Sequence, residues 1–186
     1  MKDHYFIAAA IPTDTKQEIY EHSKVIHKYG DFKSFVHPQD YHVTLAFLGN
    51  IGFSQLQTIK KELAILASKH KEIPMQVKGI EVFGNVDSPR VIWADVMVYN
   101  RLLVLQKEIT ETCDRLQINY DKKEYRPHIT IGRRWNEEYS FPIEDIKNDF
   151  VKNNHNSFSI QHIVLYKTHR DRLPKYQPIG IYSLHS

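Results

Sequence analysis

The sequence predicts an α+β fold in which most of the sheet is antiparallel. The expected elements run strand, helix, strand, helix, hairpin, helix, strand, helix and two strands, which is not the regular alternation of a doubly wound parallel fold. In addition, the motif His-x-Thr followed by an apolar residue occurs at residues 42–45 and again at residues 128–131. This repetition indicates that the two halves of the chain are related.

The composition is that of an ordinary globular protein. The chain has 186 residues, 41% of them hydrophobic and 25% charged, and no linker-like segment divides it. We therefore expect residues 1–186 to form one domain, at most with two lobes. The formal net charge of +3 permits an anionic ligand without requiring one, and no block of Lys and Arg forms a nucleic-acid-binding tail.

The N-terminus and the cysteine content point to the cytoplasm. Cys113 is the only cysteine, which excludes an intramolecular disulfide and fits a reducing compartment. The first residues are unlike a signal peptide, because a short apolar run follows Asp3 and ends at Pro12. No stretch approaches the roughly 18 apolar residues of a membrane span. We expect a cytoplasmic monomer with no membrane contact and no obligate protein partner.

The expected strands are short apolar runs bounded by turn-forming residues. The sequence GNVDSP, residues 84–89, is rich in turn formers, so the strands on either side of it should form a hairpin. A basic loop, residues 169–178, separates the last two strands. The expected strands cover residues 5–11, 41–48, 75–83, 90–98, 125–135, 157–168 and 179–186.

The expected helices each have an apolar stripe at helical spacing or a start signal. Asp14 with Gln17 resembles a capping box, Ser54 and Asn100 are candidate N-caps, and Pro142 stands before the first apolar residue of the last helix. Gly30 is the stop signal of the first helix. The expected helices cover residues 13–30, 54–70, 100–118 and 142–151.

The repeated motif is the strongest functional signal in the chain. With 11 His and 8 Thr in the sequence, chance gives about 0.5 His-x-Thr matches, and about 0.1 when apolar residues are required at the second and fourth positions. A single histidine on a strand is usually structural. Packing alone, however, does not require the same polar pair twice.

Strand geometry explains the spacing. Residues i and i+2 of a strand point to the same face, roughly 6.5–7 Å apart. His42 and Thr44 should therefore share one face, and we expect Val43, Leu45 and Phe47 on the other. By the same rule, the second motif places His128 and Thr130 opposite Ile129 and Ile131.

If a pseudo-twofold axis relates the halves, the two polar faces meet in one pocket. Two hydroxyl groups can donate to the non-bridging oxygens of a phosphodiester. Displacement at phosphorus is in line, so a base and an acid must approach from opposite sides, and histidine titrates near neutral pH. The spacing alone does not decide which histidine is the acid.

The sequences HVTL and HITI match the paired motifs of the 2H phosphoesterase superfamily. More narrowly, the chain resembles its RNA 2′,3′-cyclic phosphodiesterases, also called 2′-5′ RNA ligase-like proteins. The resemblance extends from YFIAAAIP at residues 5–12, through VFGNVDSPRVIWADV at residues 82–96, to KYQPIGIYSL at residues 175–184. It implies a bilobal fold of two mainly antiparallel sheets flanked by helices, with the active site in the cleft between the lobes.

The resemblance also implies a reaction and residue roles. It implies hydrolysis of a terminal 2′,3′-cyclic phosphate, on RNA or on a cyclic nucleotide, to a 2′-phosphate without a metal or another cofactor. His42 would be the general acid that protonates the leaving 3′ oxygen, and His128 the general base that activates water. Thr44 and Thr130 would bind the phosphate oxygens.

Further substrate-binding candidates flank the motifs. Arg133 follows the second motif, but strict alternation from His128 would point it away from the site, so contact with phosphate requires a bulge. Tyr125, Arg126 and Tyr176 could hold an RNA end by charge and stacking. The remaining histidines show no metal-binding spacing, so no metal site is expected.

Four alternatives remain open. The resemblance also allows ligation of 2′-5′ linked RNA or hydrolysis of another cyclic phosphodiester. A protein that binds RNA ends without catalysis is a third possibility, although the presence of both histidines argues against it. A metal-dependent hydrolase is the fourth, and it would lose its activity in EDTA.

Overall fold

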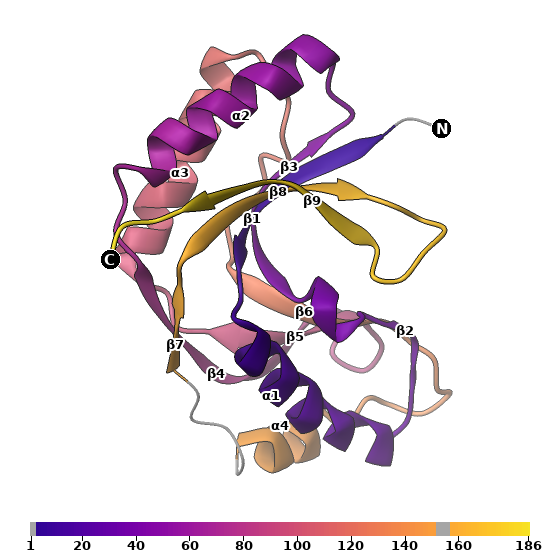
Figure 1. Ribbon diagram of the computed structural model, residues 1–186. Coiled ribbons are helices and arrows are strands. Elements are labelled where there is room, and N and C mark those ends of the chain that lie inside the picture. The colour runs from indigo at the N-terminus through magenta and orange to yellow at the C-terminus, as the bar shows by residue number, and fades with distance from the viewer. Residues whose placement is uncertain (1–2, 152–156) are drawn as a thin grey trace.

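The protein contains two antiparallel sheets, which Figure 1 shows one above the other. The computed structural model describes residues 3–151 and 157–186. The four-stranded sheet has the order β3-β1-β8-β9, the five-stranded sheet has the order β2-β6-β5-β4-β7, and neighbouring strands in both are antiparallel. The strands are β1 (His4–Ala10), β2 (Phe32–Phe35), β3 (His42–Gly49), β4 (Ile73–Gly84), β5 (Pro89–Val96), β6 (His128–Trp135), β7 (Ser157–Ile160), β8 (His162–Thr168) and β9 (Tyr176–Ser183). The predicted α+β class and the predicted hairpin of β4 and β5 are confirmed.

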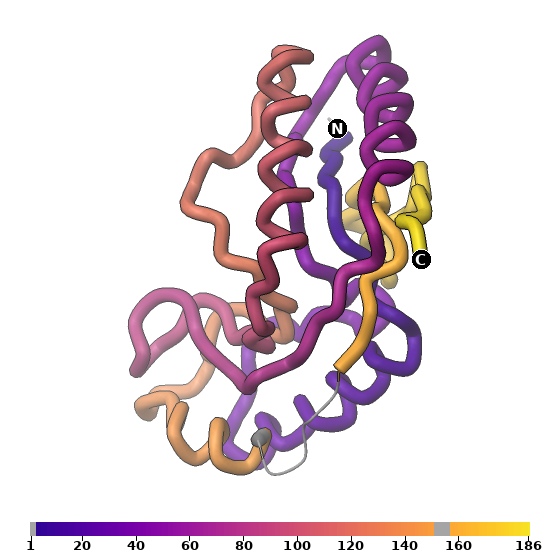
Figure 2. Tube along the Cα trace, turned by 90° about the vertical axis from the view of Figure 1, so that its left-hand side faces the viewer, coloured from indigo at the N-terminus to yellow at the C-terminus, as the bar shows by residue number. Residues whose placement is uncertain are grey.

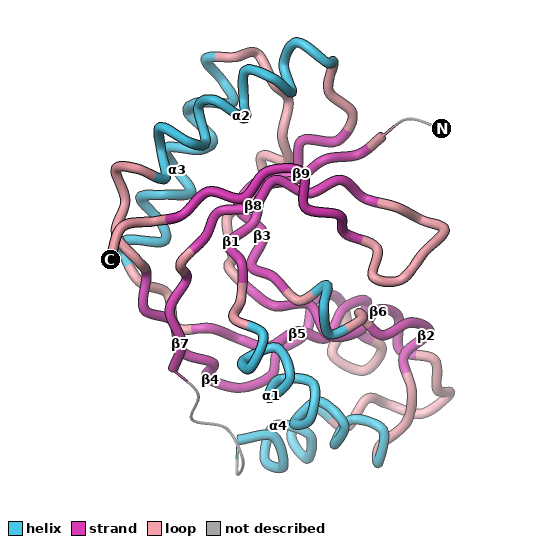
Figure 3. The backbone as a smooth tube through the Cα atoms, viewed as in Figure 1, coloured by secondary structure: helices cyan, strands magenta, loops and turns pink. Residues whose placement is uncertain are grey.

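The helices lie at the two ends of the molecule, with the strands between them (Figure 3). The helices α2 (Phe53–Ala67) and α3 (Asn100–Arg115) lie side by side against the four-stranded sheet (Figure 2). The helices α1 (Thr13–Ser23) and α4 (Ile143–Val151) lie on the side of the five-stranded sheet (Figure 1). Each sheet with its helices forms one lobe. The chain crosses between the two lobes several times, which is why no linker is visible in the sequence. None of the helices among the described residues is long and apolar enough to cross a membrane.

One hydrophobic core contains residues of both sheets. Ile7 of β1, Val43 of β3, Ile92 of β5 and Ile129 of β6 are all fully buried in it. A second, smaller cluster lies on the opposite face of β1 and β8. It consists of Phe6, Ala8, Val164 and Tyr166. This smaller cluster forms an apolar floor on the face of the sheet that carries the first His-x-Thr motif.

The predicted starts of α1 and α3 at residues 13 and 100 are confirmed and α2 begins one residue before its predicted start, but the predicted capping residues are wrong. The helix α1 begins at Thr13, where the Asp14 carboxylate accepts from the Thr15 backbone N–H and Gln17 bonds Glu21 instead of forming a capping box. The N-cap residues of α2 and α3 are Gly52 and Tyr99, so the predicted caps Ser54 and Asn100 lie inside the helices. The helices α1 and α2 therefore begin one residue before the polar residue that was taken as the cap, and α3 begins at that residue.

Two further predictions are corrected by the structure, and one strand was missed. Residues 157–168 are not one strand, because β7 pairs with β4 in one sheet and β8 pairs with β1 in the other. The predicted first helix ends early and continues as a 3-10 helix over Lys24–Lys28, before Gly30 adopts a φ of 129°. The strand β2 was not predicted, since its four residues carry too short a pattern.

Candidate active site

The two His-x-Thr motifs lie at the beginnings of β3 and β6, which belong to different sheets and contact each other. In β3, Val43 and Leu45 are buried while His42 and Thr44 are only partly buried. The same alternation holds in β6, where the buried residues are Ile129 and Ile131 and the partly buried ones are His128 and Thr130. The apolar residues anchor each strand in the core and leave an imidazole and a hydroxyl on the other face, as the period of two predicted.

The tautomer of both histidines follows from their hydrogen bonds. The Nδ1 of His42 lies 2.6 Å from the backbone carbonyl oxygen of Asp40, and the Nδ1 of His128 lies 2.7 Å from that of Arg126. A carbonyl oxygen can only accept, so Nδ1 carries the proton and donates in each case. The Nε2 atom of each ring is therefore the atom left for proton transfer.

Aromatic rings enclose His42. The rings of Phe6 and Tyr176 have their centroids 4.8 and 5.2 Å from that of His42. Burial among these rings lowers the pKa of His42 to about 4, against the hydrogen bond to Asp40, which raises it. The charges of Lys16, His128 and Arg133 lower this pKa further, which shows that the two motifs lie within electrostatic reach of each other. The Thr44 hydroxyl lies 3.0 Å from His42 Nε2 and donates to it when the ring is neutral.

His128 lies in a corresponding aromatic environment in the other lobe. Its ring forms T-shaped contacts with the rings of Phe83 and Trp93, with centroid separations of 4.9 and 5.5 Å. Burial is again the largest cause that lowers its pKa, and the charges of Arg133 and Arg126 add to it. Burial therefore favours the neutral form of both rings in the free protein. One of them must take up a proton when an anionic substrate binds if it is to act as a general acid.

A bulge follows the threonine of each motif. In β3, Thr44 pairs with Ala8 and Ala46 with Ile7, so Leu45 is the extra residue. In β6, Thr130 pairs with Trp93 and Gly132 with Ile92, so Ile131 is the extra residue. Each bulge moves the following residues to the opposite face of the sheet.

The bulges place Phe47 and Arg133 on the face of the sheet that carries the histidine and threonine of each motif. These residues occupy equivalent positions, five residues after each histidine. The expectation that Phe47 points away from His42 is therefore wrong: Phe47 pairs with Phe6, and the two ring centroids are 5.7 Å apart. The bulge that Arg133 requires is present, and its guanidinium acts on the pKa values of both histidines.

The other predicted binding residues have different surroundings. The charge of Arg133 lowers the pKa of Tyr176, although burial raises it overall, so the two side chains approach from different lobes. The guanidinium of Arg126 lies over the ring of Trp93, with its Cζ atom 4.8 Å from the centroid. Tyr125 packs against the core, and its buried hydroxyl has no hydrogen-bond partner among the described residues.

Asp40 is a functional candidate that the sequence analysis missed. Its side chain is 4% exposed, and the carboxylate accepts from the backbone N–H groups of Lys175 and Tyr176 at 2.7 and 3.0 Å. Its backbone carbonyl holds His42 Nδ1. One residue thus connects the general acid candidate with the start of β9. The only signal in the sequence was a carboxylate two positions before the motif, which is too common to be informative.

The structure offers no preformed metal site in residues 3–151 and 157–186. In these segments no group of three His, Cys, Asp or Glu side chains lies close enough together to hold a metal ion. Cys113 is buried in α3 among core residues, as its place near the apolar stripe suggests.

Comparisons with known proteins place this arrangement in a family. The sequence model of the LigT-like phosphoesterases matches residues 10–93. An RNA 2′,3′-cyclic phosphodiesterase of Methanocaldococcus jannaschii is 31% identical over 88% of this chain and 90% of its own length. Another protein of the same name, from Bacillus subtilis, is 29% identical over 99% of this chain and 98% of its own length. A third, from Geobacillus stearothermophilus, is 32% identical over 98% of this chain, which spans only 58% of that relative.

Solved structures share the fold. The structure of E. coli LigT complexed with 3′-AMP superposes with a TM-score of 0.76 at 18% identity, and the match covers 100% of both chains. A protein of Thermus thermophilus superposes with a TM-score of 0.78 at 20% identity over 98% of both chains. At this level of identity the likeness concerns the fold.

A bilobal α+β fold that brings one His-x-Thr pair from each sheet together defines a phosphoesterase of the two-histidine class. Within this class, the match of the LigT-like family model and the similarity to the M. jannaschii relative over most of both chains identify the family. The protein belongs to the LigT-like phosphoesterase family and is a hydrolase. The family resemblance seen in the sequence is confirmed.

Proposed function

We propose that this protein hydrolyses the 2′,3′-cyclic phosphate at an RNA end to a 2′-phosphate, without a metal ion. The observation that carries the proposal is the matched state of the two histidines, each with Nδ1 held by a carbonyl and Nε2 left for chemistry. The names of the relatives, RNA 2′,3′-cyclic phosphodiesterase, support the choice of substrate.

The proposed reaction is an in-line displacement at phosphorus. Nε2 of His128 takes a proton from water, and the water oxygen forms a bond to phosphorus. The bond from phosphorus to the 3′ oxygen breaks, and Nε2–H of His42 protonates that oxygen. The product has a 2′-phosphate and a 3′-hydroxyl, and the two histidines return to their starting states by proton exchange with solvent.

We propose that binding of the substrate causes His42 to take up the proton that a general acid needs. Burial holds the pKa of His42 at about 4 in the free protein, so the ring is neutral at pH 7. A phosphodiester anion between the two imidazoles favours the protonated form and raises this pKa. The leaving oxygen then replaces the Thr44 hydroxyl as the partner of Nε2. This exchange frees the Thr44 hydroxyl to donate to a non-bridging oxygen, and the Thr130 hydroxyl is proposed to donate to the other.

The positions of three of the four predicted substrate-binding residues support their proposed role. Arg133 shares the face of Thr130 and is proposed to bind the phosphate. Tyr176 packs against His42, and Arg126 covers Trp93 beside His128, so both are proposed to border the terminal nucleoside. Tyr125 has no such support, because its ring packs against the core.

The proposal also concerns the cellular location and the oligomeric state of the protein. We propose that it acts in the cytoplasm, which the single cysteine supports, and that it is a monomer without an obligate protein partner. Light scattering on the purified chain tests the monomer, and a dimer at micromolar concentration would contradict it.

Product analysis tests the reaction. An RNA with a terminal 2′,3′-cyclic phosphate is incubated with the protein in EDTA, and the product is compared with authentic 2′- and 3′-phosphates. We expect the 2′-phosphate only. A 3′-phosphate would contradict the assigned leaving oxygen, and activity that disappears in EDTA would favour a metal-dependent hydrolase. An absence of turnover would favour ligation, another cyclic phosphodiester or a protein that binds RNA ends without catalysis.

A further inference from the structure

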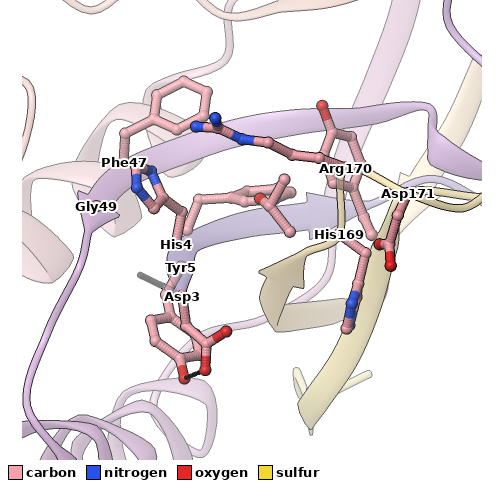
Figure 4. A pocket seen from close by; sticks show the side chains of 11 residues that line it. Asp3, His4, Tyr5, Phe47, Gly49, His169, Arg170 and Asp171 are labelled. Atoms are coloured by element: carbon pink, nitrogen blue, oxygen red, sulfur yellow. Dashed lines mark hydrogen bonds between the residues drawn. The ribbon is translucent and has the colours of Figure 1, made fainter. Parts of the chain in front are cut away.

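A pocket with a volume of about 520 Å³ adjoins the catalytic residues. It lies between the start of β1, the end of β3 and the loop that joins β8 to β9 (Figure 4). Phe6 and Tyr176 line it, and these two rings also contact His42. The pocket is therefore a continuation of the active site. Its volume is within the range of about 300–1,000 Å³ that is typical of sites for small ligands.

Aromatic rings form one wall of this pocket. Besides Phe6 and Tyr176, the wall includes Phe47, whose side chain is 49% exposed. A large aromatic side chain with this exposure has no structural need to be apolar. The bulge at Leu45 turns it toward the catalytic face and away from the core. An exposed ring beside a phosphate-binding site suits the stacking of a nucleobase.

A free cation lies opposite the aromatic wall. Figure 4 shows the Arg170 side chain extending across the pocket toward Phe47. Within residues 3–151 and 157–186, Arg170 is exposed and makes no side-chain hydrogen bond or ion pair. The carboxylate of Asp3, which also lines the pocket, is paired with Lys167 at 2.8 Å and not with Arg170. A guanidinium without a partner in a pocket is suited to a phosphate.

The far end of the pocket offers an acceptor. Asp171 lines it, and Figure 4 shows its carboxylate on the side away from Phe47. A carboxylate would repel a second phosphate but can accept a hydrogen bond from a ribose hydroxyl. The three features together require a ligand with an aromatic base, one phosphate and a sugar hydroxyl. A ribonucleotide unit has all three.

We infer that this pocket binds the second nucleotide of the RNA substrate, counted from the cyclic phosphate end. Arg170 binds the phosphodiester that joins the second nucleotide to the terminal one, and Phe47 stacks on the base of the second nucleotide. The inference rests on the proposed function and narrows it: the substrate is an RNA chain of at least two nucleotides, and a cyclic mononucleotide leaves the pocket empty.

The test compares two substrates that differ only in length. These are adenosine 2′,3′-cyclic phosphate and an oligoadenylate of four nucleotides that ends in the same group. They are assayed with the wild-type protein, with Arg170→Gln, and with Arg172→Gln, a matched control in the same loop that does not line the pocket. We expect wild-type kcat/KM to be higher for the oligonucleotide. Arg170→Gln should lower that value about 10-fold and leave the mononucleotide value unchanged, as expected for one charge-assisted contact.

A second measurement isolates the phosphate contact. The tetranucleotide that ends in a 2′-phosphate is a reaction product and is not turned over, so its affinity can be measured against salt concentration. The affinity falls as the salt concentration rises, and each phosphate contact of a single-stranded nucleic acid makes the negative slope of log K against log salt steeper by about 0.7. Arg170→Gln should reduce the slope by about this amount, and Arg172→Gln should not.

The outcomes separate this inference from the proposed function. Equal wild-type kcat/KM for both substrates, or equal effects of Arg170→Gln and Arg172→Gln, would contradict the binding of a second nucleotide in the pocket. The proposed cyclic phosphodiesterase activity would not be affected by either result. An equal loss with the mononucleotide would also overturn it, because Arg170 would then act on the terminal nucleotide. If the wild-type protein hydrolyses neither substrate, the proposed function fails, and the inference fails with it.

Discussion

His42 and His128 are held by the same hydrogen bond in two different lobes. In each, Nδ1 donates to the backbone carbonyl two residues earlier in the chain, over 2.6 Å for His42 and 2.7 Å for His128. The matched geometry gives the two rings the same tautomer. Their surroundings differ, since Thr44 bonds His42 Nε2 directly and no corresponding bond to His128 is present among the described residues.

Removal of either imidazole should abolish catalysis. We expect His42→Ala and His128→Ala each to lower kcat about 100- to 10,000-fold with the cyclic phosphate substrate, because each removes a general acid or base. His27→Ala, at an exposed histidine paired with Asp31, is the control and should keep full activity. Circular dichroism should show all three variants folded. Full activity in either active-site variant would contradict the mechanism.

The threonine hydroxyls should matter less than the imidazoles. Thr44→Val and Thr130→Val keep the β-branched shape but remove the donor to a non-bridging oxygen, so we expect kcat/KM to fall about 10- to 1,000-fold. Thr58→Val on the exposed face of α2 is the matched control. If both active-site variants retained wild-type kcat/KM, the hydroxyls would have no role in holding the phosphate.

The pH dependence of kcat/KM should be bell-shaped with an acidic maximum. This parameter reports the free protein, in which burial lowers the pKa of His42 to about 4 and lowers that of His128 as well. Both limbs therefore lie below the ordinary histidine value of about 6.5. The bound phosphate raises the pKa values, so the limbs of kcat should lie at higher pH. A kcat/KM maximum above pH 7, or a flat profile between pH 5 and 9, would contradict this assignment.

The same burial should make the protein sensitive to acid. The unfolded chain binds a proton at His42 below about pH 6.5, whereas the folded protein binds it only near pH 4, so stability falls as the pH decreases between these values. The loss from this residue is at most about 3 kcal/mol and is complete below pH 4. Urea unfolding of His42→Asn should show a shallower decrease over this range. An equal decrease in both proteins would contradict the lowered pKa.

Asp40 should position His42 and Tyr176 without touching the substrate. Asp40→Asn replaces one acceptor by an amide N–H that faces the backbone donor of Lys175 or Tyr176. We expect the free energy of unfolding to fall by about 1–3 kcal/mol. We also expect kcat to fall about 10-fold with little change in KM, when the assay is run well below the melting temperature.

Two comparisons make the Asp40 test specific. Asp31→Asn, at an exposed carboxylate of the other lobe, should change neither parameter. A purely structural role for Asp40 would lower stability but leave kcat of the folded fraction unchanged, and that result would contradict the positioning role.

The two candidate catalytic pairs could be predicted from the sequence alone. A strand has a period of two wherever it lies, so residues 42–45 and 128–131 necessarily expose a histidine and a threonine on one face and bury their neighbours. The element order was also sufficient for the α+β class. Both are local properties of the chain.

Which other residues lie beside these candidate pairs depends on the tertiary structure. Phe47 and Arg133 reach the site only because Leu45 and Ile131 bulge, and a bulge depends on how β1 and β5 pair with the motif strands. Asp40 contributes through the start of β9, more than 130 positions away in the chain. Likewise, residues 157–168 divide between two sheets because β4 and β1 offer separate edges. Cross-strand pairing and long-range hydrogen bonds have no local pattern, and only the folded chain brings their partners together.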